Sequence, residues 1–436
     1  MKKVGVVSLG CCKNRVDTEV MLAQLKSAGY ELTPYEEQAD VLVVNTCGFI
    51  DAAKREAIDT ILDMARYKTQ GDLKKLVVTG CLSQRYAQTL YEEMPEIDLI
   101  LGTGQYRRIG EYLQKRERFV KVDEPDTDYD YGARVLTTPP HYAYLRVADG
   151  CDNKCSYCAI PSIRGAYASR TMEDVLSEAQ ALAGRGVAEL NVVAQDTTRY
   201  GMDRYQKPML PELLTRLCRI DGVRWVRLLY LYPDLITEEL LDVMEQEEKV
   251  CKYVEMPIQH AHDAVLARMN RRGDSALIAK LMRDIRARSG AFIIRTSLIT
   301  GFPGEVEQEH EALLRFIQEN EFDRLGVFEY SQEEGTKAAS MKQVEPDVRR
   351  ARYAELMDAQ KEISHRRNGL RVGKTYEALI EGAAQDGAYL ARSYGEAPEI
   401  DPHICVITDT KLAPGDFVRV RITQAGDYDL TGELAT

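Results

Sequence analysis

Three segments near the N-terminus share one pattern, in which an apolar, β-branched run ends at a cysteine. The runs are VGVVSLGC, ADVLVVNTC and KKLVVTGC, and they end at Cys11, Cys47 and Cys81. Each run is typical of a strand buried on both faces. Helix-like stretches follow at residues 16–28, 52–67 and 83–94. This alternation predicts a parallel sheet with crossover helices, whose carboxyl edge, where ligands bind in such sheets, would hold all three cysteines.

The segment 122–140 differs from what precedes it, because it is acidic, rich in tyrosine and contains proline (DEPDTDYDYGARVLTTPP). Such a composition is typical of a linker that wraps or tethers. We therefore expect an N-terminal domain at 1–121, this linker, a second domain at 141–369 and a C-terminal domain at 370–436.

Strand and helix patterns alternate again in the second domain. The strand candidates are YAYLRVA, ELNVVAQ, WVRLLYLY, YVEMPI, FIIRTSLIT and RLGVFEYS. The helix candidates after them are residues 173–185, 210–220, 237–246, 275–288, 306–320 and 347–368. Six βα units fall short of the eight that close a full barrel, so the pattern predicts an open, partial (β/α)6 barrel.

The last segment consists of short strand patterns separated by Gly, Pro and Asp turns, such as TYEALIEG and DFVRVRITQAG. It predicts a small all-β barrel or sandwich. The fold class is therefore α/β, with a parallel N-terminal domain, a partial barrel and a small all-β domain.

The chain carries ten cysteines. The apolar stretch in its first residues (MKKVGVVSLGC) is too short for a secretory signal, and no run of about 18 apolar residues occurs in the sequence. We expect a cytoplasmic protein with no membrane partner, whose reduced thiols serve metals or chemistry rather than disulfides. The net charge of -12 gives no general reason to expect nucleic-acid binding.

The sequence GCDNKCSYCAIPSIRG places Cys151, Cys155 and Cys158 in one loop with Cys-x3-Cys-x2-Cys spacing. Three thiolates bind three irons of a cubane and leave the fourth iron open to a substrate. The alternative is a zinc knuckle, which needs a fourth ligand. His141 lies ten residues upstream, but at a strand entrance rather than in a ligand pair.

This loop, with Tyr157 before its last cysteine, resembles the signature of the radical S-adenosylmethionine (SAM) superfamily. The resemblance implies that the open iron of a [4Fe-4S] cluster binds SAM and that an electron cleaves SAM to a 5′-deoxyadenosyl radical. It also implies that Tyr157 lies near the adenine.

The N-terminal segments SLGCCKNRVDTE, NTCGFI and TGCLSQR resemble those that hold an auxiliary cluster in the radical SAM methylthiotransferases. This implies that Cys11, Cys47 and Cys81 bind a second [4Fe-4S] cluster. Cys12 departs from the family pattern, and its share in ligation stays open. The C-terminal segment is similar to the TRAM module. The family attaches a methylthio group to an unactivated carbon, with sulfur from the second cluster and the methyl group from a second SAM.

Other candidate residues follow the barrel strands, where active-site residues are expected. These are Gln195, Asp196, Asp234, Gln259 and His260. Arg295 could pair with the carboxylate of SAM or form a structural ion pair. Residues 301–305 (GFPGE) resemble a family segment that lines the SAM pocket, or form a plain turn. We expect structural roles for the two histidines His260 and His262 and for the remaining cysteines, which are Cys218, Cys251 and Cys405.

Charge bears on the substrate, which the family resemblance restricts to a tRNA adenosine or a protein side chain. Residues 371–436 contain six basic and eleven acidic residues, a net charge of -5. An acidic module suits a basic protein better than phosphates, although Arg419 and Arg421 could form a basic face.

The segment RSYGEAPEID, residues 392–401, also resembles the RimO-type branch of the family, which methylthiolates the β-carbon of an aspartate in small-subunit ribosomal protein twelve. We favour this reaction, with that basic protein, free or on the ribosome, and an electron donor such as a flavodoxin-type protein as partners. A tRNA adenosine methylthiotransferase and a non-catalytic iron-sulfur protein that binds the ribosome are the alternatives.

Overall fold

The computed structural model describes residues 2–125, 132–288, 292–384 and 387–435. These residues form two compact units. Unit 1 comprises Met1–Thr137, Ala148–Arg170 and Ser331–Ala339, and unit 2 comprises Thr138–Val147, Thr171–Tyr330 and Ser340–Thr436. The loop with the Cys-x3-Cys-x2-Cys spacing therefore groups with the N-terminal segments in unit 1. Residues 126–131 of the expected linker lie outside the described residues.

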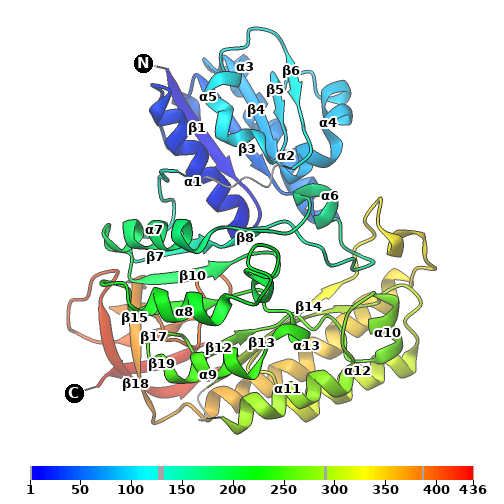
Figure 1. Ribbon diagram of the computed structural model, residues 1–436, viewed down its shortest axis with the longest axis vertical. Helices are drawn as coiled ribbons and strands as arrows, with labels where there is room; N and C mark the ends of the chain where they lie inside the picture. Colours follow the sequence, from blue (N-terminus) through cyan, green and yellow to red (C-terminus); the bar gives the residue numbers. More distant parts are fainter. Residues whose placement is uncertain (1, 126–131, 289–291, 385–386, 436) are drawn as a thin grey trace. The chain divides into compact units, whose positions relative to one another are not determined.

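The core of unit 1 is a parallel sheet with the strand order β2-β1-β3-β4-β5-β6. Its strands are β1 (Lys3–Ser8), β2 (Glu31–Leu32), β3 (Val41–Thr46), β4 (Lys75–Gly80), β5 (Leu99–Leu101) and β6 (Phe119–Lys121). Its helices are α1 (Cys12–Ser27), α2 (Asp51–Ala65), α3 (Tyr67–Gln70), α4 (Cys81–Glu93) and α5 (Ile109–Tyr112). Helices α1 and α5 cover one face of the sheet, and α2 and α4 cover the other (Figure 1).

Both faces of the central strands are buried, which explains the continuous apolar runs of the sequence. Every residue of β3 is buried. Leu42 and Val44 pack with Ala57 and Ile61 of α2 in one core, while the residue between them, Val43, faces the other side. The direction of the crossovers reverses between β1 and β3, so the carboxyl ends of these two strands flank the crevice where doubly wound sheets bind ligands.

Unit 2 contains the predicted partial barrel, and within the described ranges all six strand–helix pairs are present. The strands are β7 (Tyr142–Arg146), β10 (Glu189–Val193), β11 (Trp225–Leu228), β12 (Tyr253–Glu255), β13 (Ile293–Thr300) and β14 (Arg324–Glu329). The helices after them are α7 (Met172–Ala183), α8 (Leu210–Cys218), α9 (Glu238–Gln246), α11 (Ser275–Ala287), α12 (Glu307–Asn320) and α13 (Pro346–Gly369), with a further helix α10 (Asp263–Arg268).

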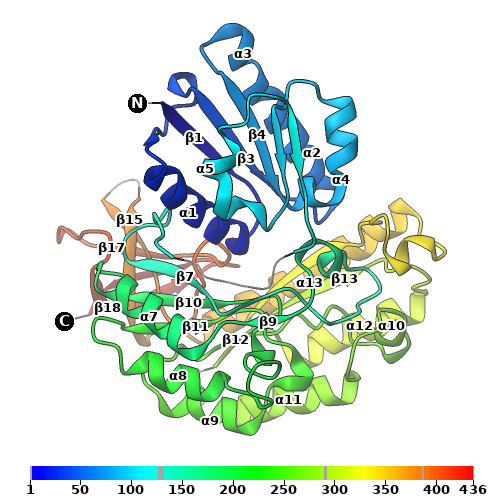
Figure 2. The same cartoon turned by 45° about the horizontal axis from the view of Figure 1, so that its top comes forward.

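The strands pair in parallel as β11-β10-β7 and β12-β13-β14, and a parallel bridge between Val226 and Val250 joins the two groups. The helices lie on the outer side of the strands (Figure 2). Thr171 and Thr237 start α7 and α9 as N-caps, since their hydroxyl groups accept hydrogen bonds from backbone N–H groups of the first turn.

The C-terminal segment is a closed β-barrel in the order β15-β16-β17-β19-β18. Its strands are β15 (Thr375–Ala383), β16 (Ala388–Arg392), β17 (Ile404–Ile407), β18 (Phe417–Ala425) and β19 (Leu430–Leu434). Ile380, Ile404 and Val420 belong to its apolar core. Among the described residues, no helix has both the length and the apolar content needed to cross a membrane.

Residues 392–401 connect this small barrel to the strands of the partial barrel, within unit 2. The hydroxyl groups of Tyr142 and Tyr144 donate hydrogen bonds to the carboxylate of Glu399, at 2.9 and 3.0 Å. Tyr253 donates one of 2.6 Å to Asp401. The segment is thus bound to buried side chains of strands that precede it by more than a hundred residues.

Buried charges at the same junction form what we call the barrel network: Glu189, Arg227, Arg324, Arg371, Arg392 and Glu396. Glu189 pairs with Arg227 at 2.8 Å and with Arg392 at 2.7 Å, and all three side chains are fully buried. Glu396 pairs with Arg371 and with Arg324. Its other oxygen accepts hydrogen bonds from the N–H and hydroxyl groups of Ser393. Every charge of this network therefore meets a protein partner.

Candidate metal centre

The cysteines of the threefold pattern come together at the carboxyl edge of the unit 1 sheet. Cys11 precedes α1, Cys47 follows β3 and Cys81 is the first residue of α4. A β-carbon on Gly10 would lie 2.9 Å from Cβ of Cys47, and one on Gly48 would lie 2.7 Å from the backbone nitrogen of Leu82. The three segments therefore touch one another at positions that have no room for a side chain.

Burial and mutual repulsion disfavour the ionised thiols in this trio. Burial raises the pKa of Cys47 and raises that of Cys81 to about 12, and the charge of Cys11 adds to both shifts. Arg164 acts in the opposite direction on both groups. Since a thiolate is the form that binds metal, a metal would have to displace protons here.

Asn14 ties the three cysteine segments together from the first turn of α1. Its buried amide donates hydrogen bonds of 3.1 Å to the carbonyl of Leu9 and of 3.0 Å to that of Thr46. These carbonyls lie just before Cys11 and Cys47. Its Oδ1 accepts a hydrogen bond of 3.5 Å from the thiol of Cys81. One side chain thus fixes all three strand ends.

Arg164 forms the centre of a second buried group, which we call the Arg164 cluster: Asn14, Asp17, Cys81, Asp149 and Arg164. Its guanidinium donates to Asn14 Oδ1 at 2.6 Å and to Cys81 Sγ at 3.6 Å. The other Nη lies 2.7 Å from Asp17 and 3.4 Å from Asp149. Arg164 is the last residue of α6 (Ile160–Arg164), the helix that follows Cys158. The cluster therefore joins the loop of the second trio to Cys81.

The loop of the second trio is closed by main-chain hydrogen bonds. It begins after β8 (Ala148–Asp149), which pairs with β9 (Ala168–Ser169), and the N–H of Cys151 donates to the carbonyl of Gly165. The N–H of Cys158 donates to the carbonyl of Cys155 at 3.1 Å. The Cys158 sulfur accepts a hydrogen bond of 3.4 Å from the N–H of Ile160. Tyr157 is half-buried within this loop.

The segment Ser331–Ala339 contacts both cysteine regions of unit 1. The N–H of Ala338 donates to the carbonyl of Ser156, between Cys155 and Cys158, at 2.8 Å. Glu333 forms an almost completely buried ion pair with Arg85 of α4 at 3.0 Å. Arg85 also donates to the carbonyl of Gly48, next to Cys47. This segment thus holds the two cysteine regions in one structure.

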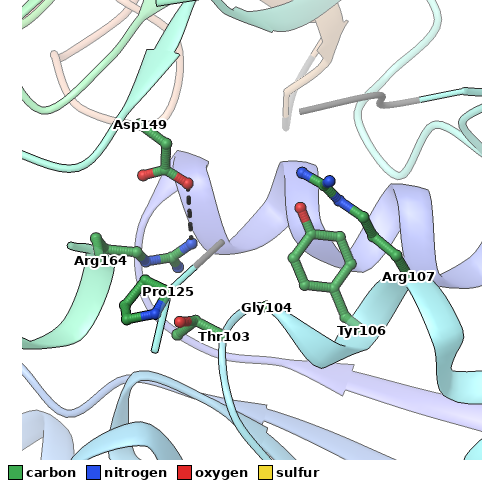
Figure 3. A pocket seen from close by; sticks show the side chains of 7 residues that line it. All are labelled: Thr103, Gly104, Tyr106, Arg107, Pro125, Asp149 and Arg164. Carbon is green, nitrogen blue, oxygen red and sulfur yellow. Dashed lines mark hydrogen bonds and ion pairs between the residues drawn. The ribbon is translucent and has the colours of Figure 1, made fainter. Parts of the chain in front are cut away.

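A small pocket opens beside the Arg164 cluster. Figure 3 shows the pair of Arg164 and Asp149 on one side of it and Tyr106 and Arg107 on the other. Thr103, which also lines it, donates a hydrogen bond to the carbonyl of Ile163 in α6. The pair therefore lines a pocket of unit 1 in addition to contacting Cys81.

The donor set fits a multi-iron cluster better than a single ion. Within the described residues, no three His, Cys, Asp or Glu side chains are close enough to bind one metal ion. Zinc gathers four donors around one point, whereas a cubane holds each thiolate on a different iron. The three cysteines of each trio fit a cubane with one open iron, and a zinc knuckle would need a fourth ligand beside them.

The predicted site residues outside unit 1 lie in unit 2, and several have protein partners there. Arg295 lies 3.2 Å from Glu255 and 3.4 Å from Asp401, which is the structural ion pair expected as one of its two roles. Gln195 is half-buried after β10. Asp234 pairs with Arg272, and Thr198 donates a hydrogen bond to Asp196. Gln259 pairs by its backbone with β13.

The GFPGE segment forms a turn stabilised by Glu305, whose carboxylate contacts Arg352, His260 and the N–H of Phe302. His260 is fully buried, as expected of a structural histidine. Cys218 and Cys251 are buried and Cys405 is half-buried. These contacts agree with packing roles for these residues.

Sequence patterns did not reveal Asn14, Asp17, Asp149, Arg164 and Glu333 as site residues. One signal was available, because the first turns of α1 (CKNRVDTE) lack the apolar periodicity of a surface helix, yet Asn14, Asp17 and Thr18 are buried. A buried polar helix face beside a cysteine indicates a polar site.

Comparison with protein families divides the chain into three matches. Residues 3–102 match an uncharacterized protein family, UPF0004, residues 145–317 match the radical SAM superfamily, and residues 372–435 match the TRAM domain.

Curated relatives match this chain over nearly its whole length. The chain is 49% identical to "Ribosomal protein uS12 methylthiotransferase RimO" of Thermoanaerobacter sp. (strain X514), over 99% of this chain and 100% of the relative. It is 50% identical to the protein of that name from Pelotomaculum thermopropionicum, over 99% of both. Among solved structures, the radical SAM methyltransferase TsrM from Kitasatospora setae shares the fold, with a TM-score of 0.56 and 13% identity over 78% of this chain and 77% of that one.

Proposed function

Because this chain belongs to the family of ribosomal protein uS12 methylthiotransferases, we propose that it adds a methylthio group to the β-carbon of an aspartate in protein uS12. The enzyme class rests on relatives that share about half of their residues with the chain over its full length. The choice of the aspartate rests on the resemblance of residues 392–401. The cofactors are two [4Fe-4S] clusters and SAM.

The reaction explains why cofactors are needed, since the C–H bond to be replaced offers no acidic proton to a side-chain base. When bound, the cofactors supply the electron that cleaves SAM to a hydrogen-abstracting 5′-deoxyadenosyl radical, the sulfur atom and, from a second SAM, the methyl group. The protein itself contributes the thiolates, their spacing and their surroundings.

We assign Cys151, Cys155 and Cys158 to the cluster that binds SAM, because their Cys-x3-Cys-x2-Cys spacing resembles the radical SAM signature and three ligands leave one iron open. We assign Cys11, Cys47 and Cys81 to the auxiliary cluster. The close contacts at Gly10 and Gly48 and the hydrogen bonds of Asn14 support this second assignment. The side chain of Asn14 would orient the segments, and the N–H of Ile160 would donate to the Cys158 thiolate.

For SAM itself we propose contacts from Tyr157 to the adenine and from Gln195 and Arg295 to the rest of the molecule. Arg295 also pairs with Glu255 and Asp401, which is the structural role predicted as its alternative.

Protein uS12, free or on the ribosome, is the proposed partner, together with a flavodoxin-type electron donor and a cytoplasmic location. The names of the relatives favour a protein substrate over a tRNA adenosine, and a family of enzymes argues against a non-catalytic ribosome-binding protein. We expect direct nucleic-acid binding to be weak.

Mass spectrometry of uS12 after anaerobic incubation with reconstituted enzyme, SAM and a reductant tests this proposal. We expect the mass of one methylthio group in place of one hydrogen, located on an aspartate, and 5′-deoxyadenosine as a by-product. A deletion strain that lost a methylthio group from tRNA nucleosides, with uS12 unchanged, would contradict it.

A further inference from the structure

Arg164 belongs to the loop of the second cysteine trio and contacts residues of the first cysteine region. The guanidinium is 4% exposed and touches Asn14, Asp17, Cys81 and Asp149. Asp149 lies two residues before Cys151, and Arg164 lies six residues after Cys158. Arg164, from the loop of the second trio, therefore contacts Cys81, a proposed ligand of the auxiliary cluster.

The contact with Cys81 changes character when the thiol becomes a metal-bound thiolate. The thiol now donates to Asn14 Oδ1 at 3.5 Å and accepts from Arg164 at 3.6 Å. A thiolate has no proton to donate, so the Arg164 hydrogen bond remains and becomes charge-assisted. Hydrogen bonds to cluster sulfurs and nearby positive charge favour the reduced, more negative state of an iron-sulfur cluster.

We propose that Arg164 is a positioning residue that raises the reduction potential of the auxiliary cluster through its hydrogen bond to Cys81. This inference rests on the proposed function, because it requires a cluster at Cys11, Cys47 and Cys81. Its consequence is that the loop that binds one cluster sets the electronic properties of the other.

Asp17 provides a test in the opposite direction. Its carboxylate lies 2.7 Å from the guanidinium and offsets part of its charge. Removal of that negative charge leaves the Arg164 cluster more positive, which favours the reduced state further. Variants of Arg164 and Asp17 should therefore shift the potential to opposite sides of the parent.

The experiment isolates the auxiliary cluster in a parent in which Cys151, Cys155 and Cys158 are all replaced by alanine. Iron is counted after anaerobic reconstitution, and the potential is measured by a redox titration followed by electron paramagnetic resonance. We expect Arg164→Met to lower the equilibrium constant for one-electron reduction about tenfold, which is a negative shift of about 59 mV. Arg164→Lys should shift less, and Asp17→Asn should shift the potential upward.

Arg118→Met is the matched control, since Arg118 of unit 1 donates to the carbonyls of Ile97 and Met94 and stacks on Tyr91. It should leave the potential unchanged. Full iron loading with an unchanged potential in Arg164→Met would overturn the inference alone. If the Arg164 variants bind no iron, Asp17→Asn decides, and absence of an upward shift overturns it. A parent that binds no iron would overturn both the proposed function and this inference.

Discussion

Unit 1 and unit 2 each contain a group of buried charges that includes arginine. The two groups differ in whether a cysteine sulfur is among the contacts of the arginine. In the barrel network, the carboxylates of Glu189 and Glu396 pair with arginine side chains, and Glu396 also accepts a hydrogen bond from the N–H of Ser393. In the Arg164 cluster, the contacts run from two carboxylates through the guanidinium to the sulfur of Cys81. Charges that pair with one another stabilise the fold, whereas a charge that contacts a proposed metal ligand can also change the properties of the metal.

The largest expected effect breaks the barrel network at Glu396. Glu396→Ala leaves Arg324 and Arg371 buried without their shared partner, so we expect the free energy of unfolding to fall by about 3–5 kcal/mol. Urea unfolding measures this. Glu433→Ala is the control, because its pair with Arg421 is exposed and should contribute less than about 1 kcal/mol. Iron lost from the folded Glu396 variant would contradict a purely structural role.

The opposite result is expected in unit 1, where Asn14→Ala should act mainly on metal binding. The variant frees the strand-end carbonyls of Leu9 and Thr46 and removes the acceptor of the Cys81 thiol. Loss of such an outer-shell partner typically weakens metal affinity by about 10- to 100-fold. Competition with an iron chelator measures the change. Asn320→Ala, which removes a single hydrogen bond to the carbonyl of Phe316 in α12, should retain its iron.

Low pH should lower the stability of unit 2 by protonating the carboxylate of Glu396. Burial by itself would raise the pKa of Glu396, but Arg371 and Arg324 outweigh it and hold this pKa far below its usual value of 4.5. The stabilisation is therefore complete above pH 4.5 and is lost as the pH falls toward the folded-state pKa. In urea unfolding of cluster-free protein from pH 6 downward, the parent should lose its advantage over Glu396→Gln below about pH 4.5. A constant difference would refute the assignment.

The smallest effect is expected from Cys12→Ala. This variant tests whether Cys11 alone or Cys12 as well binds the auxiliary cluster in unit 1. The Cys11 charge acts on both Cys47 and Cys81, and Cys12 already forms the first residue of α1. We expect unchanged iron content in Cys12→Ala and loss of the auxiliary cluster in Cys11→Ala. Equal losses in both variants would mean that the two cysteines share the role.

Periodicity predicted most of the fold because it reports burial along one segment. It identified β1, β3 and β4 with their cysteines, and the strand–helix pairs of the partial barrel. It missed β2, β5 and β6, which are only two or three residues long and too short to show a period. It also gave no sign that residues 148–170 and 331–339 belong with unit 1.

The sequence predicted that Cys11, Cys47 and Cys81 lie at one edge of the sheet, but it did not predict the residues that surround them. Asn14, Asp149 and Arg164 are far apart in sequence, and nothing local marks them as neighbours. The charge argument on the substrate counted residues that are buried, which sequence could not show. Glu396 and Asp401 are buried, but so are Arg371 and Arg392, so these four charges cancel and the acidic excess of residues 371–436 is unchanged without them.

The segment 392–401 limits how this protein could be re-engineered. A transplanted TRAM module that lacked the carboxylates of Glu399 and Asp401 would leave the hydroxyl groups of Tyr142 and Tyr253 without their acceptors. The host barrel would then contain uncompensated polar groups in its interior. A successful chimera must therefore exchange the barrel residues that contact the module together with the module itself.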